Sequence, residues 1–284
     1  MKPIVQSLWV GSELSELERY SILSFLNTGH EFHLYTYEPV RGVPPGTKIM
    51  DANEIMKEND VFTLKEQFLP FSDIWRYKML YEKGNYWVDV DMIAIKKLDF
   101  KEPYVFSSER TIQKGAYKMS VPLVPNIGVL KAPKGSEFYL ELYNKCIDIQ
   151  SRGKNQDKIK YMRVLREMIE QYGYSKYVKK PEYFCHLDWW HAKDAYLHVP
   201  NYREKYGVKG KSVNSMFTGK NVYTVHLWRN LATHKYKLDL NGEFPEMSFY
   251  EMAKRYIDTG KVPEFKPPEK KKKMKMKTKK KSRN

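Results

Sequence analysis

The sequence predicts an α/β fold built around a parallel sheet. Residues 3–11 have the composition of a strand, residues 14–26 place apolar side chains at helical spacing, and residues 31–37 alternate as a strand does. A strand, a helix and a strand in this order favour a right-handed βαβ unit. Further along, a helix over residues 73–83 leads into an apolar strand over residues 86–95. Ligands of such sheets bind at the carboxyl ends of the strands.

The helix over residues 73–83 presents an acid and a cation to one side. Ser72 is the expected N-cap, and Asp73 would lie near the positive end of the helix dipole. Asp73 and Arg76 are three residues apart and are therefore neighbours on the helix surface. Taken alone, the two residues indicate an intrahelical ion pair. Gly84 is expected to end the helix with a left-handed backbone conformation.

The strand over residues 86–95 carries two acids in an otherwise apolar run. Asp89 and Asp91 are two residues apart, so in a strand their side chains point the same way. Adjacent carboxylates repel each other and are costly to bury unless a cation lies near both. The sequence therefore predicts a site for Mn²⁺ or Mg²⁺, which take oxygen ligands and can carry substrate phosphates.

The helix and the strand together resemble a known signature. The spacing of Asp73, Arg76, Gly84, Asp89 and Asp91 is similar to that of glycosyltransferases with a DXD sugar-binding region. This family includes initiating α-1,6-mannosyltransferases of yeast, α-1,4-glycosyltransferases and capsular polysaccharide enzymes, with the clostridial glucosylating toxins as distant relatives. The residue after the glycine is asparagine where the family has a second glycine, a mild change because Asn tolerates left-handed angles.

The resemblance implies a GT-A fold, in which a Rossmann-like mixed sheet is flanked by helices. We expect one glycosyltransferase domain over residues 1–265 with a helical insertion. The insertion, residues 137–206, would form the acceptor side, and it contains amphipathic helical patterns at residues 137–146 and 159–169.

The first strand resembles the family segment whose tryptophan lies beside the nucleotide base. Trp9 would stack on the base, which contributes about 1–3 kcal/mol. Gly11 closes the same turn and is assigned to the donor site with it. Core packing explains Trp9 equally well when that residue is considered alone.

Two later segments complete the predicted site. Asn126 lies in a stretch similar to the family strand beneath the sugar, and it is a candidate for hydrogen bonds to donor hydroxyls, with a turn asparagine as the alternative. His226 and Trp228 resemble the family's late His-x-Trp motif. His226 would complete the metal shell, which favours manganese, and Trp228 would donate its indole N–H to a phosphate. A core histidine is the alternative for His226.

The resemblance implies transfer of a sugar from a UDP- or GDP-sugar to a glycan, glycoprotein or glycolipid, with retention at the anomeric centre. Asp91 would ligate the metal, and Asp89 would hold the metal or the ribose. Asp73 and Arg76 would grip the sugar, and Arg76 would also stabilise the departing phosphate. An inverting enzyme would need a base near the acceptor, for which Asp188 is a weak candidate.

The net charge of +16 is concentrated at one end of the chain. From Lys266 onward, 11 Lys and Arg residues accompany a single acid, Glu269, which places +10 in this tail and leaves +6 for the rest. Residues 266–284 are expected to be disordered. They could contact an anionic membrane surface, at about 1 kcal/mol per basic residue, or nucleic acid, or simply keep the protein in solution.

Composition also limits the compartment and the function. No apolar run reaches the roughly 18 residues of a membrane span, and we find no signal-peptide core. Cys146 and Cys185 suit a reducing compartment, so we expect a cytoplasmic, bacterial or virus-encoded enzyme that is soluble or membrane-peripheral. Two alternatives stay open. A non-catalytic polysaccharide- or nucleic-acid-binding protein would use the many aromatic residues, and a nucleotide-sugar hydrolase would differ only in accepting water.

Overall fold

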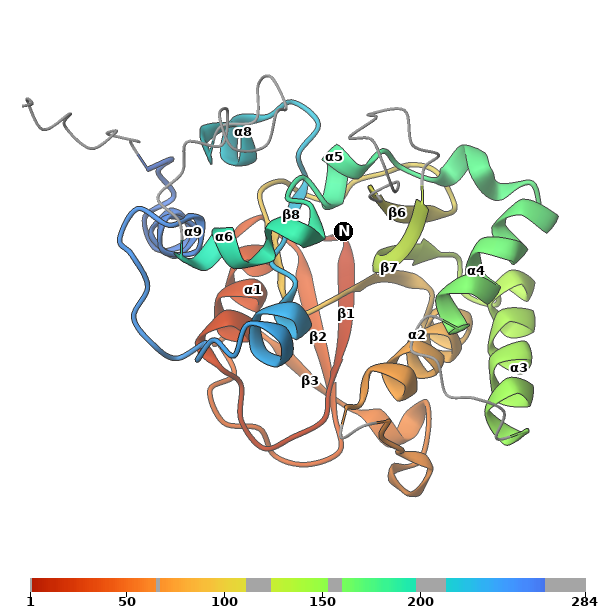
Figure 1. The fold of residues 1–284 in the computed structure, drawn as a ribbon. Coiled ribbons are helices and arrows are strands. Elements are labelled where there is room, and N and C mark those ends of the chain that lie inside the picture. The colour runs from red at the N-terminus through yellow and green to blue at the C-terminus, as the bar shows by residue number, and fades with distance from the viewer. Residues whose placement is uncertain (1, 65–66, 111–123, 153–159, 198–212, 264–284) are drawn as a thin grey trace, which may run out of the picture.

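A six-stranded mixed sheet lies between two layers of helices (Figure 1). The computed structural model describes residues 2–64, 67–110, 124–152, 160–197 and 213–263. The strand order is β3-β2-β1-β4-β7-β6, in which the first four are mutually parallel and β7 is antiparallel to both β4 and β6. The strands are β1 (Ile4–Trp9), β2 (Glu31–Thr36), β3 (Lys48–Asp51), β4 (Asn85–Val88), β6 (Val105–Glu109) and β7 (Val124–Ala132). The predicted α/β class, a mixed sheet flanked by helices, is confirmed.

The N-terminal βαβ unit is confirmed. Helix α1 (Glu16–Asn27) connects the parallel strands β1 and β2, and it begins with a capping box between Ser15 and Glu18. Phe25 of α1 packs in the same apolar cluster as Val5 and Phe32 of the two strands. This packing covers one face of the sheet.

The opposite face is covered by three helices, α2 (Leu69–Lys83), α3 (Glu137–Ser151) and α4 (Lys160–Gln171) (Figure 1). Trp75 of α2 and Trp87 of β4 are both fully buried there, with ring centroids 6.1 Å apart. The prediction of Ser72 as N-cap was wrong. The helix begins at Leu69, because Pro70 suits the first turn of a helix and starts it earlier.

The predicted strand over residues 86–95 is two strands. β4 ends at Val88, a turn closed by the Met92 N–H on the Asp89 carbonyl (3.2 Å) follows, and β5 (Met92–Ala94) pairs with β8 (Thr224–His226). The prediction of one continuous strand was wrong because an apolar run does not reveal that its two ends have different partners. The turn carries the chain from the large sheet to a separate two-stranded one.

The remaining described elements are short. They are α5 (Pro181–Phe184), α6 (Ala192–Leu197), α8 (Val213–Thr218), α9 (Phe249–Thr259), the 3₁₀ turns η1 (Ala52–Glu54), η2 (Glu58–Asp60), η3 (Tyr174–Tyr177) and η4 (Trp189–His191), and the π turn η5 (Leu231–Lys235). Helix α9 packs against α1 and α6 (Figure 1). Within the described residues, no helix has both the length and the apolar character needed to cross a membrane. The predicted tail, residues 266–284, lies outside the described residues, and the domain limits stay predictions.

Candidate metal and donor site

The candidate residues gather at one edge of the large sheet. β1 ends at Trp9 and the parallel β4 ends just before Asp89. Because β7 is antiparallel and pairs Val129 with Val88, its first residues, including Asn126, lie at the same edge. This is the carboxyl edge of the parallel strands, where ligands of α/β sheets bind.

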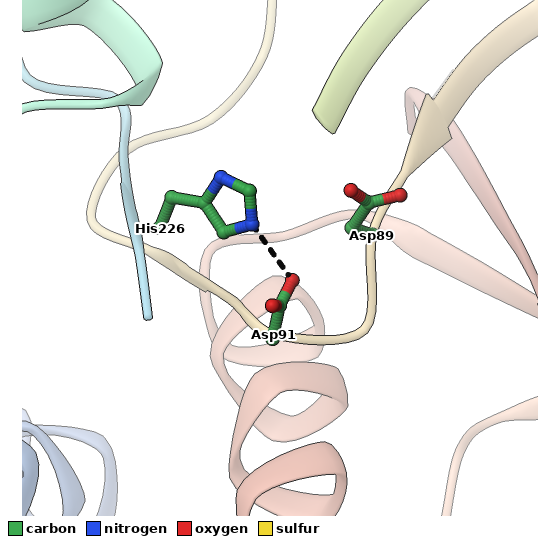
Figure 2. Close-up of side chains that lie close together, drawn as sticks. All are labelled: Asp89, Asp91 and His226. Atoms are coloured by element: carbon green, nitrogen blue, oxygen red, sulfur yellow. Dashed lines mark ion pairs between the residues drawn. The ribbon is translucent and has the colours of Figure 1, made fainter. Parts of the chain in front are cut away.

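Asp89, Asp91 and His226 form a cluster that can hold a metal ion. Each offers one ligand atom, and these atoms all lie within 4.8 Å of one another. Figure 2 shows the two acids on either side of the turn after β4 and the imidazole reaching toward Asp91 from β8, with His226 Nε2 3.2 Å from Asp91 Oδ1. The acids converge, although through a turn and not through strand alternation as predicted.

The surroundings of Asp91 fit a cation. Its Oδ2 accepts a hydrogen bond of 2.7 Å from the backbone N–H of Arg229. Its Oδ1 is buried and lies 3.2 Å from His226 Nε2. The second acid, Asp89, lies close to this pair, and neighbouring carboxylates repel each other unless a proton or a metal ion offsets their charge. Two carboxylates and one imidazole suit Mn²⁺ better than Mg²⁺, because nitrogen ligands favour the transition metal.

The pKa values in this cluster describe a carboxylate paired with an imidazolium. Burial acts to raise the pKa of Asp91, but the charge of His226 and the Arg229 N–H outweigh it, so the pKa of Asp91 lies below its usual range. Burial acts to lower the pKa of His226, and Asp91 outweighs it and raises the pKa well above 6.5. An ion bound here would take the place of the imidazole proton, so binding releases a proton.

Arg76 is buried beneath Asp89 and has every N–H group engaged. Its Nε donates to the Ser72 carbonyl (3.1 Å), and Nη1 donates to Asp89 Oδ1 (2.7 Å) and to the Ile127 carbonyl (3.0 Å). Nη2 donates to Ser72 Oγ (3.0 Å) and lies 3.1 Å from Asp73 Oδ1. The geometry makes Arg76 a support for the acids. Its predicted grip on the sugar stays a prediction and would require release of one of these bonds.

Asp89 is held on one side only. Its Oδ1 accepts a second hydrogen bond from Trp87 Nε1 (2.9 Å), and the guanidinium of Arg76 lies 4.4 Å from the centroid of the Trp87 ring. Oδ2 is therefore the natural ligand atom. Asp73, the other acid on Arg76, is buried, and this burial raises the pKa of Asp73 to about 7, with Arg76 acting to lower it and Asp89 to raise it.

Trp9 and Gly11 lie on the side predicted to take the base. The indole Nε1 of Trp9 is buried and has no hydrogen-bond partner among the described residues. Gly11 has φ +135°, and a Cβ there would lie 3.5 Å from that nitrogen. The Arg229 guanidinium lies 5.2 Å from the centroid of the Trp9 ring and pairs with buried Glu18. Arg229 therefore connects Trp9 to Asp91, whose Oδ2 accepts a hydrogen bond from the Arg229 backbone N–H.

Trp228 packs against His226, the histidine of the candidate metal cluster. Its φ of +54° is unusual for a bulky residue and marks a position held by its surroundings. The Trp228 ring stacks on His226, with centroids 3.9 Å apart. Its Nε1 donates to the Leu187 carbonyl at 3.0 Å. Donation to a phosphate stays a prediction and would require this bond to break.

Asn126 connects the sheet to the metal cluster. Its Nδ2 donates to Glu109 Oε2 (3.3 Å) and to Cys185 Sγ (3.2 Å), while Oδ1 accepts from Ser107 Oγ. Cys185 Sγ in turn lies 3.9 Å from His226 Nδ1. The turn interpretation of Asn126 was wrong, because the residue lies within β7.

Two residues of this network were not predicted. Glu109 is the last residue of the buried strand β6, as Asp89 directly follows the buried strand β4, so an acid at a strand end was the available signal. Cys185 gave no signal, because a single cysteine in an aromatic segment is typical of a core. Asp188, the weak candidate for a base, is ion-paired with Arg110 at 2.6 Å.

Comparison with solved structures found similar chains, among them two glycosyltransferases. No family model and no curated protein matches the chain. A structure described as "PaToxG Glycosyltransferase" is 13% identical, with a TM-score of 0.46, covering 60% of this chain and 69% of that one. The apo-form glycosyltransferase GlyE of Streptococcus pneumoniae TIGR4 is also 13% identical, with a TM-score of 0.37, covering 64% of this chain and 46% of that one. Both similar structures are glycosyltransferases. Because both identities are 13% and both TM-scores are below 0.5, the function of this chain is inferred from the geometry of its site.

Proposed function

We propose that this chain is a metal-dependent glycosyltransferase. It would move a sugar from a UDP- or GDP-sugar to a hydroxyl of a glycan, glycoprotein or glycolipid, with retention at the anomeric centre. The observation that carries the proposal is the cluster of Asp89, Asp91 and His226 at the carboxyl edge of the sheet, with ligand atoms within 4.8 Å of one another. A divalent cation, Mn²⁺ in preference to Mg²⁺, would offset the like charges of the two carboxylates and accept the imidazole nitrogen.

The protein residues would divide the work by position. Asp89, Asp91 and His226 would hold the ion, each through one ligand atom. Trp9 offers an aromatic face for the base, and its free N–H offers a donor beside it. Arg76 keeps Asp89 in place. When bound, the ion neutralises charge on the diphosphate leaving group.

The transfer exchanges one bond at the anomeric carbon for another. The acceptor hydroxyl oxygen forms a bond to that carbon while the bond to the diphosphate oxygen breaks. The electron pair leaves with the diphosphate, and with retention the hydroxyl proton can pass to the departing phosphate oxygen on the same face. Asn126 would hold a donor hydroxyl by releasing its present hydrogen bond to Cys185 Sγ.

The test is Mn²⁺ binding and nucleotide release for the wild type and Asp91→Ala. We expect the wild type to release UDP or GDP from at least one member of a panel of sugar nucleotides. Asp91→Ala should lower Mn²⁺ affinity, followed by electron paramagnetic resonance, and turnover by at least about 100-fold, because it removes a metal ligand. Asp60→Ala, an exposed acid in η2, is the matched control and should change neither.

Three results would overturn parts of this proposal. Equal turnover in Asp91→Ala and the wild type would refute the metal assignment. Nucleotide release that no saccharide acceptor accelerates, with free sugar as the product, would identify a hydrolase. Binding without any release would leave a non-catalytic binding protein.

A further inference from the structure

Glu109 differs from the other acids near the site. Buried or half-buried carboxylates in this region have a cation within ion-pair distance: Glu18 has Arg229, Asp91 has His226, and Asp188 has Arg110. Glu109 has no cation within 4.0 Å among the described residues. Its Oε2 accepts a hydrogen bond from Asn126 Nδ2.

The position of Glu109 is set by the sheet. β6 runs antiparallel to β7 and so parallel to β4, which places its last residue at the edge where Asp89 lies. A chain of polar contacts joins Glu109 to the metal cluster, from Oε2 to Asn126 (3.3 Å), then to Cys185 (3.2 Å) and His226 (3.9 Å). The Glu109 carboxylate thus lies at the same edge of the sheet as the cluster and is connected to His226 through Asn126 and Cys185.

A carboxylate in this position suits a ligand that donates hydrogen bonds. An ionised carboxylate can only accept them, and it has room for several. Asn126 occupies Oε2, and no described residue donates to Oε1. Burial raises the pKa of Glu109, opposed by the Asn126 hydrogen bond and the charges of Arg166 and His226. Arg166 itself is tied by its Nε to the Pro125 carbonyl at 2.8 Å.

We propose that Glu109 holds the transferred sugar of the donor, with Oε1 accepting a hydrogen bond from a sugar hydroxyl while Asn126 anchors Oε2. This inference rests on the proposed function, because it needs a sugar nucleotide at the metal cluster. A hydrogen bond to an ionised group strengthens binding by about 10- to 100-fold. Glu109 therefore contributes to affinity for the sugar and contributes nothing to affinity for the nucleotide alone.

Calorimetry on the full chain with Mn²⁺ separates these two contributions. UDP is compared with UDP-glucose and UDP-N-acetylglucosamine, and GDP with GDP-mannose, for the wild type, Glu109→Ala and Glu109→Gln. For each sugar nucleotide that the wild type binds more tightly than its diphosphate, we expect Glu109→Ala to remove 10- to 100-fold of that affinity, with diphosphate affinity unchanged within twofold. Glu109→Gln keeps one acceptor oxygen and should lose less. Glu31→Gln, at the opposite end of the sheet, is the matched control.

Each other outcome overturns a definite statement. Equal losses for diphosphate and sugar nucleotide would show that Glu109 only supports the fold, and unchanged affinities would show that it does not touch the sugar. A wild type that binds a sugar nucleotide no better than its diphosphate would also refute the inference while leaving the proposed function standing. A wild type that binds none of these nucleotides would refute the proposed function and this inference together.

Discussion

Replacing Arg76 with methionine tests whether the arginine is the buried support of the acids. Methionine nearly preserves the volume, so the change isolates the lost charge and hydrogen bonds. The variant leaves Asp73 and Asp89 without their cation, and it removes the hydrogen bonds that Arg76 donates to the Ser72 hydroxyl and the Ile127 carbonyl.

The size of the effect follows from exposure. Removing one partner of a buried ion pair costs about 3–5 kcal/mol, because the remaining charge is uncompensated. The side chain of Asp73 is 4% exposed, so water cannot replace the lost cation there. The side chain of Asp89 is 24% exposed, so water can hydrate it in part. We therefore expect a loss near the lower end, about 3 kcal/mol of unfolding free energy. For a chain of this size that is a fall in Tm of roughly 6–12 °C.

Urea unfolding at pH 8 and the Mn²⁺ titration provide the measurements. Mn²⁺ affinity should fall about 10- to 100-fold, since Asp89 loses the group that orients it. Arg152→Met is the control, because that arginine forms an exposed pair with Asp148 and should change stability by less than about 0.5 kcal/mol. Adding Asp73→Asn to Arg76→Met should restore part of the loss. If Arg76→Met is as mild as Arg152→Met, the buried network does not exist as described.

Two further changes test other parts of the structure. Burial raises the pKa of Asp73 to about 7, from about 3.9 in an unfolded chain, so the folded state binds the proton more tightly. The free energy of unfolding should therefore fall as the pH rises from about 4 to about 7, by on the order of 4 kcal/mol. Urea titrations should show that Asp73→Asn removes this pH dependence. Identical pH profiles for the two proteins would contradict the burial of Asp73. Gly84→Ala should lower the free energy of unfolding by more than about 2 kcal/mol, because φ is +66° and the new Cβ would lie 2.4 Å from the Lys134 backbone nitrogen. Gly173 has the same φ but no atom within 4 Å of the added Cβ, so Gly173→Ala should show only the backbone strain of about 1 kcal/mol. Equal losses at the two glycines would rule out the close approach.

Local features of the fold could be predicted because short-range physics sets them. The βαβ unit, the two amphipathic helices after residue 136 and the positive φ of Gly84 and Asn85 follow from apolar spacing and backbone sterics. The helix α2 begins about one turn before the predicted start. Ser72 has the composition of an N-cap, but Pro70 fits the first turn of a helix and allows α2 to begin at Leu69.

Tertiary features of the site could not be predicted from the chain. The break after Val88 depends on β8, which lies far away in the sequence and supplies the partner of β5. The sequence singled out Asp89, Asp91 and His226 as candidate metal ligands. It did not show which groups accept the hydrogen bonds of Arg76, because these include the carbonyls of Ser72 in the same helix and of Ile127 in β7. Glu109 and Cys185 could not be assigned to the site from the sequence, because both reach it through Asn126, which only the folded structure places beside them.

The pairing of β5 with β8 also decides when the three side chains of the cluster can meet. A growing polypeptide exposes its two aspartates early in synthesis, but His226 is made more than a hundred residues later. Until β8 docks on β5, the two acids have no imidazole beside them. Under the proposed function, metal loading would therefore follow the docking of β8, and a product that ends before Thr224 would lack the third ligand.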